Sequence, residues 1–112
     1  MSTMPSRAAI STPQNPMAAK MRGFLHIVRH GAGPQATYLL TYHRLDREGE
    51  RPKPVLAEGA QALIEVLERI GVNFSLREVR GALADILRLG SANIPDLWLS
   101  EEELQEKGLV EA

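Results

Sequence analysis

The stretch GFLHIVRHGAGPQATYLLTYHRL, from Gly23 to Leu45, decides the fold of this 112-residue chain. Its two ends, Gly23–His30 and Ala36–Leu45, are rich in β-branched and aromatic residues, and the segment between them is a turn with two glycines and a proline. This pattern predicts a β-hairpin. Because side chains alternate between the two faces of a strand, the register decides which residues face a core, and the sequence of the turn leaves that register open.

Two amphipathic helices are predicted after the hairpin. A charged loop, DREGERPKP at residues 46–54, separates them from the strands. Apolar residues from Leu56 to Ile70 recur at spacings of three and four, which places them on one face of a helix. A second helix is expected to begin at Ser75, whose side chain would form a capping box with Glu78. A glycine follows each helix and is expected to end it.

The C-terminal part is predicted to add an edge strand and a short helix. The segment NIPDLWLS, at residues 93–100, is largely apolar, and Pro95 excludes it from the middle of a sheet. Ser100 and Glu103 then form a second expected capping box at the start of a short C-terminal helix. The fold class is therefore α+β, with a hairpin and a short third strand packed on two antiparallel amphipathic helices.

Composition indicates one small globular domain. Residues 1–20 lack periodicity and are predicted to be a disordered tail, and residues 21–112 are predicted to form a single α+β domain. The absence of cysteine excludes disulfides, thiolate zinc sites and a cysteine nucleophile. The chain shows neither a secretory leader nor an apolar run of membrane-spanning length, so we expect a soluble cytoplasmic protein. No metal or cofactor is predicted.

A short motif, HIVRHG at residues 26–31, places Arg29 and His30 at the end of the first predicted strand. At these residues the chain resembles the opening motif of the histidine phosphatase superfamily, the relatives of phosphoglycerate mutase. The resemblance implies that His30 is a phosphorylated nucleophile and Arg29 a phosphate ligand. It covers about six residues, and the family's second downstream His has no counterpart here other than His43, on the partner strand of the same hairpin. A phosphatase, whose activity would be lost in the variant His30→Ala, is therefore a remote alternative.

The hairpin surface is a second candidate site. Alternate residues share a face, which groups Phe24, His26, Val28 and His30 on the first strand and Tyr38, Leu40, Tyr42 and Arg44 on the second. If both rows shared one exposed face, they could stack bases and hold phosphates. The alternative is that these rows face the core, with tyrosine hydroxyls at its margin.

The helix pair is a third candidate, because a helix, a short turn with glycine and a second helix outline a helix-turn-helix. Arg77, Arg80 and Arg88 form a basic ridge on the second helix, which could contact phosphates or guanine edges in a major groove. The alternative is an ordinary helical hairpin whose arginine stems cover the edge of the core.

Charge is distributed unevenly although the net charge is only −1. Residues 1–53 hold eight Lys or Arg and three acidic residues, whereas residues 54–112 hold five and eleven. This asymmetry indicates either a basic surface for phosphate or an acidic partner, or opposite charges that meet within the fold or between subunits.

These observations favour a non-enzymatic binding or adaptor module that acts through protein–protein contacts. A three-stranded sheet with one free face has to keep that face polar or cover it, and the apolar character of Tyr38, Leu40 and Tyr42 favours a partner, such as a second copy docked on the sheet. The runner-up is a nucleic-acid-binding regulator that uses the basic ridge and the hairpin. The candidate binding residues are Arg29, His30, Tyr38, Tyr42, Arg44, Arg77, Arg80 and Arg88.

Overall fold

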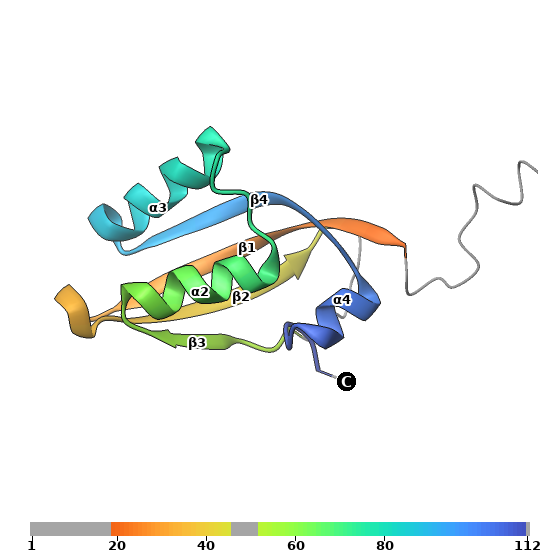
Figure 1. The fold of residues 1–112 in the computed structure, drawn as a ribbon, viewed down its shortest axis with the longest axis horizontal. Coiled ribbons are helices and arrows are strands. Elements are labelled where there is room, and N and C mark those ends of the chain that lie inside the picture. The colour runs from red at the N-terminus through yellow and green to blue at the C-terminus, as the bar shows by residue number, and fades with distance from the viewer. Residues whose placement is uncertain (1–18, 46–51, 112) are drawn as a thin grey trace, which may run out of the picture.

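The computed structural model describes residues 19–45 and 52–111, and the structural statements below concern those residues. They form an α+β fold with a four-stranded antiparallel sheet and three α-helices (Figure 1). The elements in chain order are β1 (Lys20–His30), a 3-10 turn η2 (Gly33–Gln35), β2 (Thr37–Arg44), β3 (Val55–Glu58), α2 (Ala60–Ile70), α3 (Arg77–Leu89), β4 (Ser91–Ser100) and α4 (Glu101–Glu106). The predicted α+β class is confirmed. The predicted disordered tail lies outside the described residues except for its last two, of which Lys20 belongs to β1.

The strands lie in the order β3-β2-β1-β4, and every neighbouring pair is antiparallel. The predicted hairpin is confirmed as β1 and β2, with Ile27 opposite Leu40. The predicted edge strand is confirmed as β4, which is ten residues long and pairs with β1 on one side only. Pro95 fits this position because its missing N–H costs no bond to a further strand.

The sheet has one strand more than the three predicted. Strand β3 pairs Val55 with Leu40 and Ala57 with Tyr38 along the free edge of β2. The prediction of a helix from Leu56 is therefore wrong at its start, because α2 begins at Ala60. The short strand was missed because Leu56 matched the helical spacing of the residues that follow it, although in the structure its side chain is 64% exposed.

One predicted capping box is wrong and the other is confirmed. Ser75 does not cap α3, since its hydroxyl bonds the side chain of Asn73 at 2.5 Å and the residue before the helix is Leu76. At α4 the Glu103 N–H donates to the Ser100 hydroxyl (3.0 Å), and the Ser100 N–H donates to the Glu103 carboxylate (2.9 Å). That backbone hydrogen bond lowers the pKa of Glu103, burial opposes the shift, and the nearby Lys20 ammonium also lowers it.

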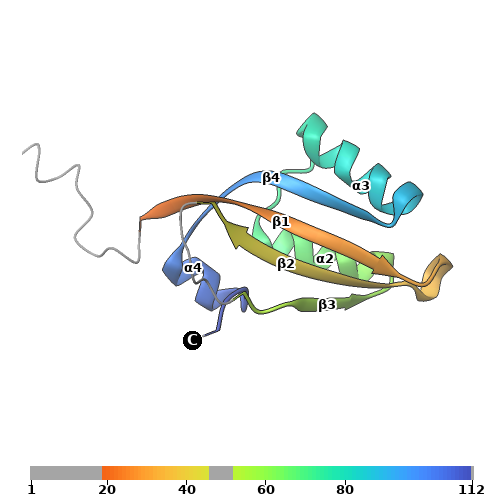
Figure 2. The same ribbon diagram turned by 180° about the vertical axis from the view of Figure 1, so that it is seen from behind.

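The helices lie on one side of the sheet. Helix α2 is in front of the strands in Figure 1 and behind them in Figure 2, and α3 runs along β4. The core lies between the two layers and includes Leu25, Ile27, Leu40, Tyr42, Leu67, Ile70, Ile86 and Ile94. No described element covers the opposite face of the sheet (Figure 2). The fold is thus a two-layer structure with one uncovered face.

A tyrosine from β2 crosses the sheet over a glycine of β1. The Tyr42 hydroxyl donates to the carbonyl oxygen of Leu97 on β4 (2.9 Å), so this side chain spans three strands beneath the helices. A Cβ atom at Gly23 would lie 2.3 Å from the Tyr42 hydroxyl oxygen, closer than any contact allows. Glycine is therefore required at position 23 for the tyrosine ring to pass.

We expect Gly23→Ala to lower the free energy of unfolding by about 1–3 kcal/mol, the usual cost of forcing an extra methyl group into a packed core. Gly81→Ala on the exposed side of α3 is the matched control. Nothing lies within 4 Å of its added Cβ, and alanine in a helix should raise stability by roughly 0.5–1 kcal/mol. Urea denaturation checks both variants, and equal stability of the Gly23→Ala and wild-type chains would contradict this packing.

Candidate functional site

The uncovered face of the sheet carries an apolar row that runs across three strands. Leu56 on β3 lies opposite Leu39 on β2, and Leu39 lies opposite Val28 on β1. Val28 and Leu39 are half-buried by their neighbours within the sheet, whereas Leu56 is largely exposed. Trp98, which pairs with Arg22 at the far end of β1, is 54% exposed. These side chains expose apolar area for which the described fold supplies no cover.

All three histidines of the chain occupy strand positions whose side chains point to this uncovered face. His26 and His30 alternate with core residues on β1, and His43 lies opposite Phe24 on β2. The Phe24 and His43 rings are 5.2 Å apart between centroids, and His26 Nδ1 is 2.7 Å from the side-chain oxygen of Asn93 on β4. The face therefore mixes aromatic rings and imidazoles with the apolar row.

A shallow hollow of about 240 Å³ opens on the same face where β4 bulges. The bulge contains Asp96, which has a φ of 58°, in the left-handed region that aspartate tolerates better than most residues. Its carboxylate accepts from Arg22 Nε at 2.6 Å. Phe24, Leu45 and Pro95 supply apolar walls to the hollow.

The two rows of hairpin residues considered from the sequence lie on opposite faces. The row Phe24, His26, Val28 and His30 faces away from the helices, and the row Tyr38, Leu40, Tyr42 and Arg44 is buried beneath them. The expectation that Tyr38, Leu40 and Tyr42 supply the apolar character of the free face is therefore wrong. The turn sequence did not fix the register of the hairpin. In the structure the row that begins with Phe24 pairs with Thr37, Leu39, Thr41 and His43, which alternate along β2 with the residues of the buried row.

Arg29 and His30 do not converge on one site. They are neighbours on a strand, so their side chains point to opposite faces, and His30 is exposed on the uncovered one. Arg29 Nη1 instead donates to the carbonyl oxygens of Ile86 (3.0 Å) and Leu87 (2.7 Å) in the last turn of α3. This cation satisfies carbonyls that a helix C-terminus leaves without partners. The structure thus gives Arg29 a structural contact at the position where the motif implied a phosphate ligand.

Arg44 is also held inside the fold. It is 8% exposed, and its guanidinium pairs with the Glu101 carboxylate at 2.5 Å and contacts the Met21 sulfur. Together with the pairs Lys20–Glu103 (3.5 Å) and Arg22–Asp96 (2.6 Å), this contact joins basic residues of the N-terminal half to acidic residues of the C-terminal half. For these residues, opposite charges meet within the fold.

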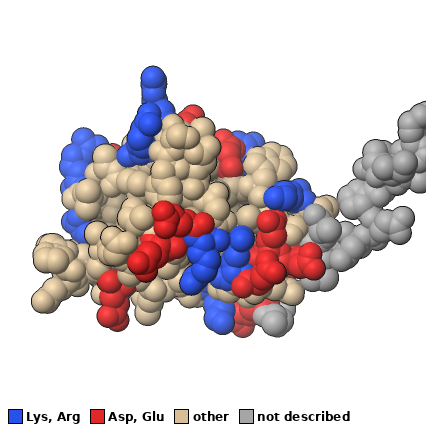
Figure 3. All heavy atoms as spheres, viewed as in Figure 1, with Lys and Arg blue, Asp and Glu red and all other residues tan. Residues whose placement is uncertain are grey.

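The arginines of the predicted basic ridge are all exposed on α3. Arg88 pairs with Asp85 at 2.6 Å, and Arg80 donates to the carbonyl oxygen of Ser75 at 3.3 Å. Figure 3 shows Lys and Arg side chains where Figure 1 places α3, with some Asp and Glu side chains beside them, and a mixture of basic and acidic side chains lower in the view, around α2 and α4. The ridge is therefore a small basic area beside acidic ones.

An apolar groove separates α2 from α3, a feature that no single segment of the sequence indicates. It has a volume of about 230 Å³, and its lining residues are Tyr38, Ala60, Leu63, Ile64, Leu83, Ile86 and Leu87. Each helix buries its own apolar stripe against the sheet, α2 beside β3 and α3 over β4 and β1. The groove remains where the two stripes do not meet.

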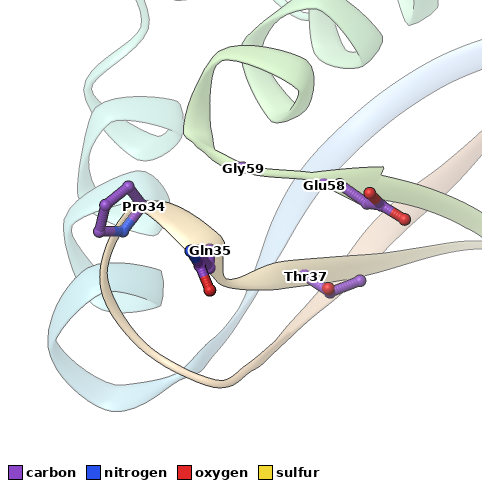
Figure 4. Close-up of a pocket in the computed structure, with 5 residues that line it drawn as sticks. All are labelled: Pro34, Gln35, Thr37, Glu58 and Gly59. Atoms are coloured by element: carbon purple, nitrogen blue, oxygen red, sulfur yellow. The ribbon is translucent and has the colours of Figure 1, made fainter.

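A second, polar hollow lies at the tip of the sheet. It has a volume of about 430 Å³ and is formed by the η2 turn, the first residue of β2 and the end of β3 (Figure 4). Thr37 and Glu58 lie opposite each other on the paired strands at its edge. Within the described ranges no three His, Cys, Asp or Glu side chains are grouped to hold a metal ion, and no helix is long and apolar enough to cross a membrane.

Comparison with known proteins adds no relative to this description. No family model matches the chain, and the searches of curated proteins and of solved structures also gave no match.

We expect Arg29→Gln to lower the free energy of unfolding by roughly 1.5–3 kcal/mol, because hydrogen bonds from a charged donor to the α3 carbonyls are lost. His30→Ala, on the adjacent but exposed position, should change it by no more than about 0.5 kcal/mol. Thermal and urea unfolding of both variants measure the difference. Equal stabilities would show that Arg29 does not hold the end of α3.

Proposed function

We propose that this chain is a non-enzymatic binding module that associates with protein, in the first instance a second copy of itself, through the uncovered face of its sheet. The observation that carries the proposal is the apolar row Leu56, Leu39 and Val28 on a face that no described element covers. Apolar area on a sheet face gains free energy when a partner removes it from water.

The dimensions of the face support a protein partner. Strands β1, β2 and β4 are eight to eleven residues long. With strands about 4.8 Å apart and a rise of about 3.3 Å per residue, four strands cover roughly 500–700 Å². Standard protein interfaces bury about 800 Å² on each partner, so the face approaches the required size.

The polar groups of the face are arranged in a way that is compatible with burial. Arg22 is paired with Asp96, and His26 is hydrogen-bonded to Asn93. A partner that covers these pairs leaves fewer unsatisfied groups than one that covers isolated charges, so the cost of desolvation is reduced. Two apolar sheet faces can pack on each other in the manner of a β-sandwich, at a separation of about 10 Å.

Nucleic-acid binding through α3 is the second candidate. The observation in its favour is the exposure of Arg77, Arg80 and Arg88 on one helix. Against it, Arg88 is already paired with Asp85, and the connection between α2 and α3, residues 71–76, is longer than the turn of about three or four residues in a helix-turn-helix. The two candidates differ in salt dependence, because phosphate contacts weaken steeply with salt and apolar contacts do not.

We expect the molar mass in solution to be that of a dimer, and the double variant Leu39→Lys, Leu56→Lys to be monomeric, because each lysine would place a charge inside the interface. The matched control is Leu76→Lys, Leu89→Lys, which replaces two exposed leucines, one just before α3 and one at its end, and should leave the dimer intact. Light scattering at low and high salt measures all three proteins.

The same experiment with a mixed DNA and RNA pool separates the candidates. A dimer that is indifferent to nucleic acid at both salt concentrations supports the sheet face as the binding surface. A wild-type monomer that shifts with nucleic acid at low salt, and no longer does so after Arg80→Glu and Arg88→Glu, would replace this proposal with the second candidate.

A further inference from the structure

The uncovered face of the sheet has an imidazole near its centre, surrounded by uncharged side chains. His26 on β1 has Phe24 and Val28 as its neighbours on this face along the strand. Across the sheet it lies opposite Thr41 on β2 and Asn93 on β4. His26 is half-buried among these residues, and the rest of its ring is exposed on the side that a partner would cover.

One hydrogen bond determines which nitrogen of the neutral ring carries the proton. Nδ1 of His26 lies 2.7 Å from the side-chain oxygen of Asn93. Because an amide oxygen can only accept, the proton of the neutral imidazole is on Nδ1. Protonation therefore adds a second N–H, at Nε2, together with a positive charge. No acceptor in the described part of the chain bonds that nitrogen.

The other two histidines of the chain are also on this face. His43 lies on β2 two positions along from Thr41, which makes it a diagonal neighbour of His26. His30 is four residues along β1 from His26, at the exposed end of the strand. When these rings are protonated, they add charges of the same sign as a charge on His26. The histidines therefore cannot neutralise one another.

The charged side chains of this face lie toward its ends in the described strands. Where β1 begins, Arg22 is paired with Asp96 at 2.6 Å, and Lys20 is paired with Glu103 of α4 at 3.5 Å. Glu58, on β3, is at the opposite end of the face. The strand positions that adjoin the central imidazole therefore hold no carboxylate that could balance its charge.

We propose that self-association through this face is controlled by pH, and that His26 is the residue that controls it. The control depends on the proposed function, because it acts on the same surface. A two-fold interface uses the same patch on both subunits, so both copies of His26 are covered together. The neutral ring keeps its hydrogen bond to Asn93 when it is covered, whereas the charged ring loses its water and meets a second charge of the same sign.

The direction of the pH dependence follows from proton binding. Histidine is the side chain whose charge ordinarily changes between about pH 5 and pH 8. The separated chains can bind protons at His26 that the dimer excludes, so a fall in pH favours the separated chains. The dimer is therefore most stable above this range of pH and is weakened as the pH falls through it.

The test is the dissociation constant of the dimer of the full chain, measured by analytical ultracentrifugation at constant salt. We expect it to rise about 10- to 100-fold between about pH 8 and about pH 5.5, because the dimer contains two copies of His26. The variant His26→Gln can still donate to Asn93 but does not titrate, so its rise should be at least about five times smaller.

His30→Gln is the matched control, since it removes an imidazole from the exposed end of the same strand, and it should retain a larger rise than His26→Gln. Circular dichroism at each pH separates dissociation from unfolding. An unchanged dissociation constant, an equal rise in His26→Gln, or dissociation only where the chain unfolds would overturn the control by His26 and leave the self-association itself standing. A wild-type monomer at the higher pH would overturn both.

Discussion

The cross-strand register of β1 and β2 is the constraint on which the rest of this structure depends. It places Leu25 and Ile27 beside Tyr42 and Leu40, so one face of the hairpin is apolar and the apolar sides of two helices can pack on it. The same register collects His26 and His43 with Val28 and Leu39 on the other face, because a period of two allows no other division. A shift by one residue would exchange the two sets and leave α2 and α3 without a core to cover. The layered fold and the uncovered face therefore have one cause.

Polar side chains buried on the helix side then connect elements that are far apart in the sequence. Tyr42 passes over Gly23 and reaches the carbonyl of Leu97, and Arg29 reaches from β1 to the last turn of α3. Arg44 does the same for α4 through Glu101. Each of these contacts fixes one end of an element relative to the sheet, and unlike the apolar packing around it, each has a defined direction. The groove between α2 and α3 follows from this arrangement, because each helix is positioned by the sheet beneath it.

Short sequence patterns predicted the individual strands, helices and caps better than the contacts between them. The hairpin, the edge strand with Pro95 and the capping box of Ser100 and Glu103 depend on residues close together in the sequence, and the structure confirms them. The strand at Val55–Glu58 was missed because its hydrogen-bond partners lie on β2, and four residues carry too weak a pattern to outweigh the adjacent helix. Of the candidate site residues, Tyr38, Tyr42 and Arg44 could not be assigned to a face until the register was known. The pairing of Arg29 with Tyr38 is likewise a consequence of register, which no motif records.

The uncovered face is where this account connects fold to function, since every proposal of self-association requires Leu39 and its neighbours to point away from the helices. The chain contains no cysteine, so one introduced thiol reports on one position alone. The most direct measurement is the rate at which a thiol reagent labels Leu39→Cys and Leu40→Cys in the folded, dilute protein. We predict rapid labelling of Leu39→Cys, and labelling of Leu40→Cys only as fast as the core opens. Rapid labelling of Leu40→Cys with protection of Leu39→Cys would contradict the register, and with it the uncovered face.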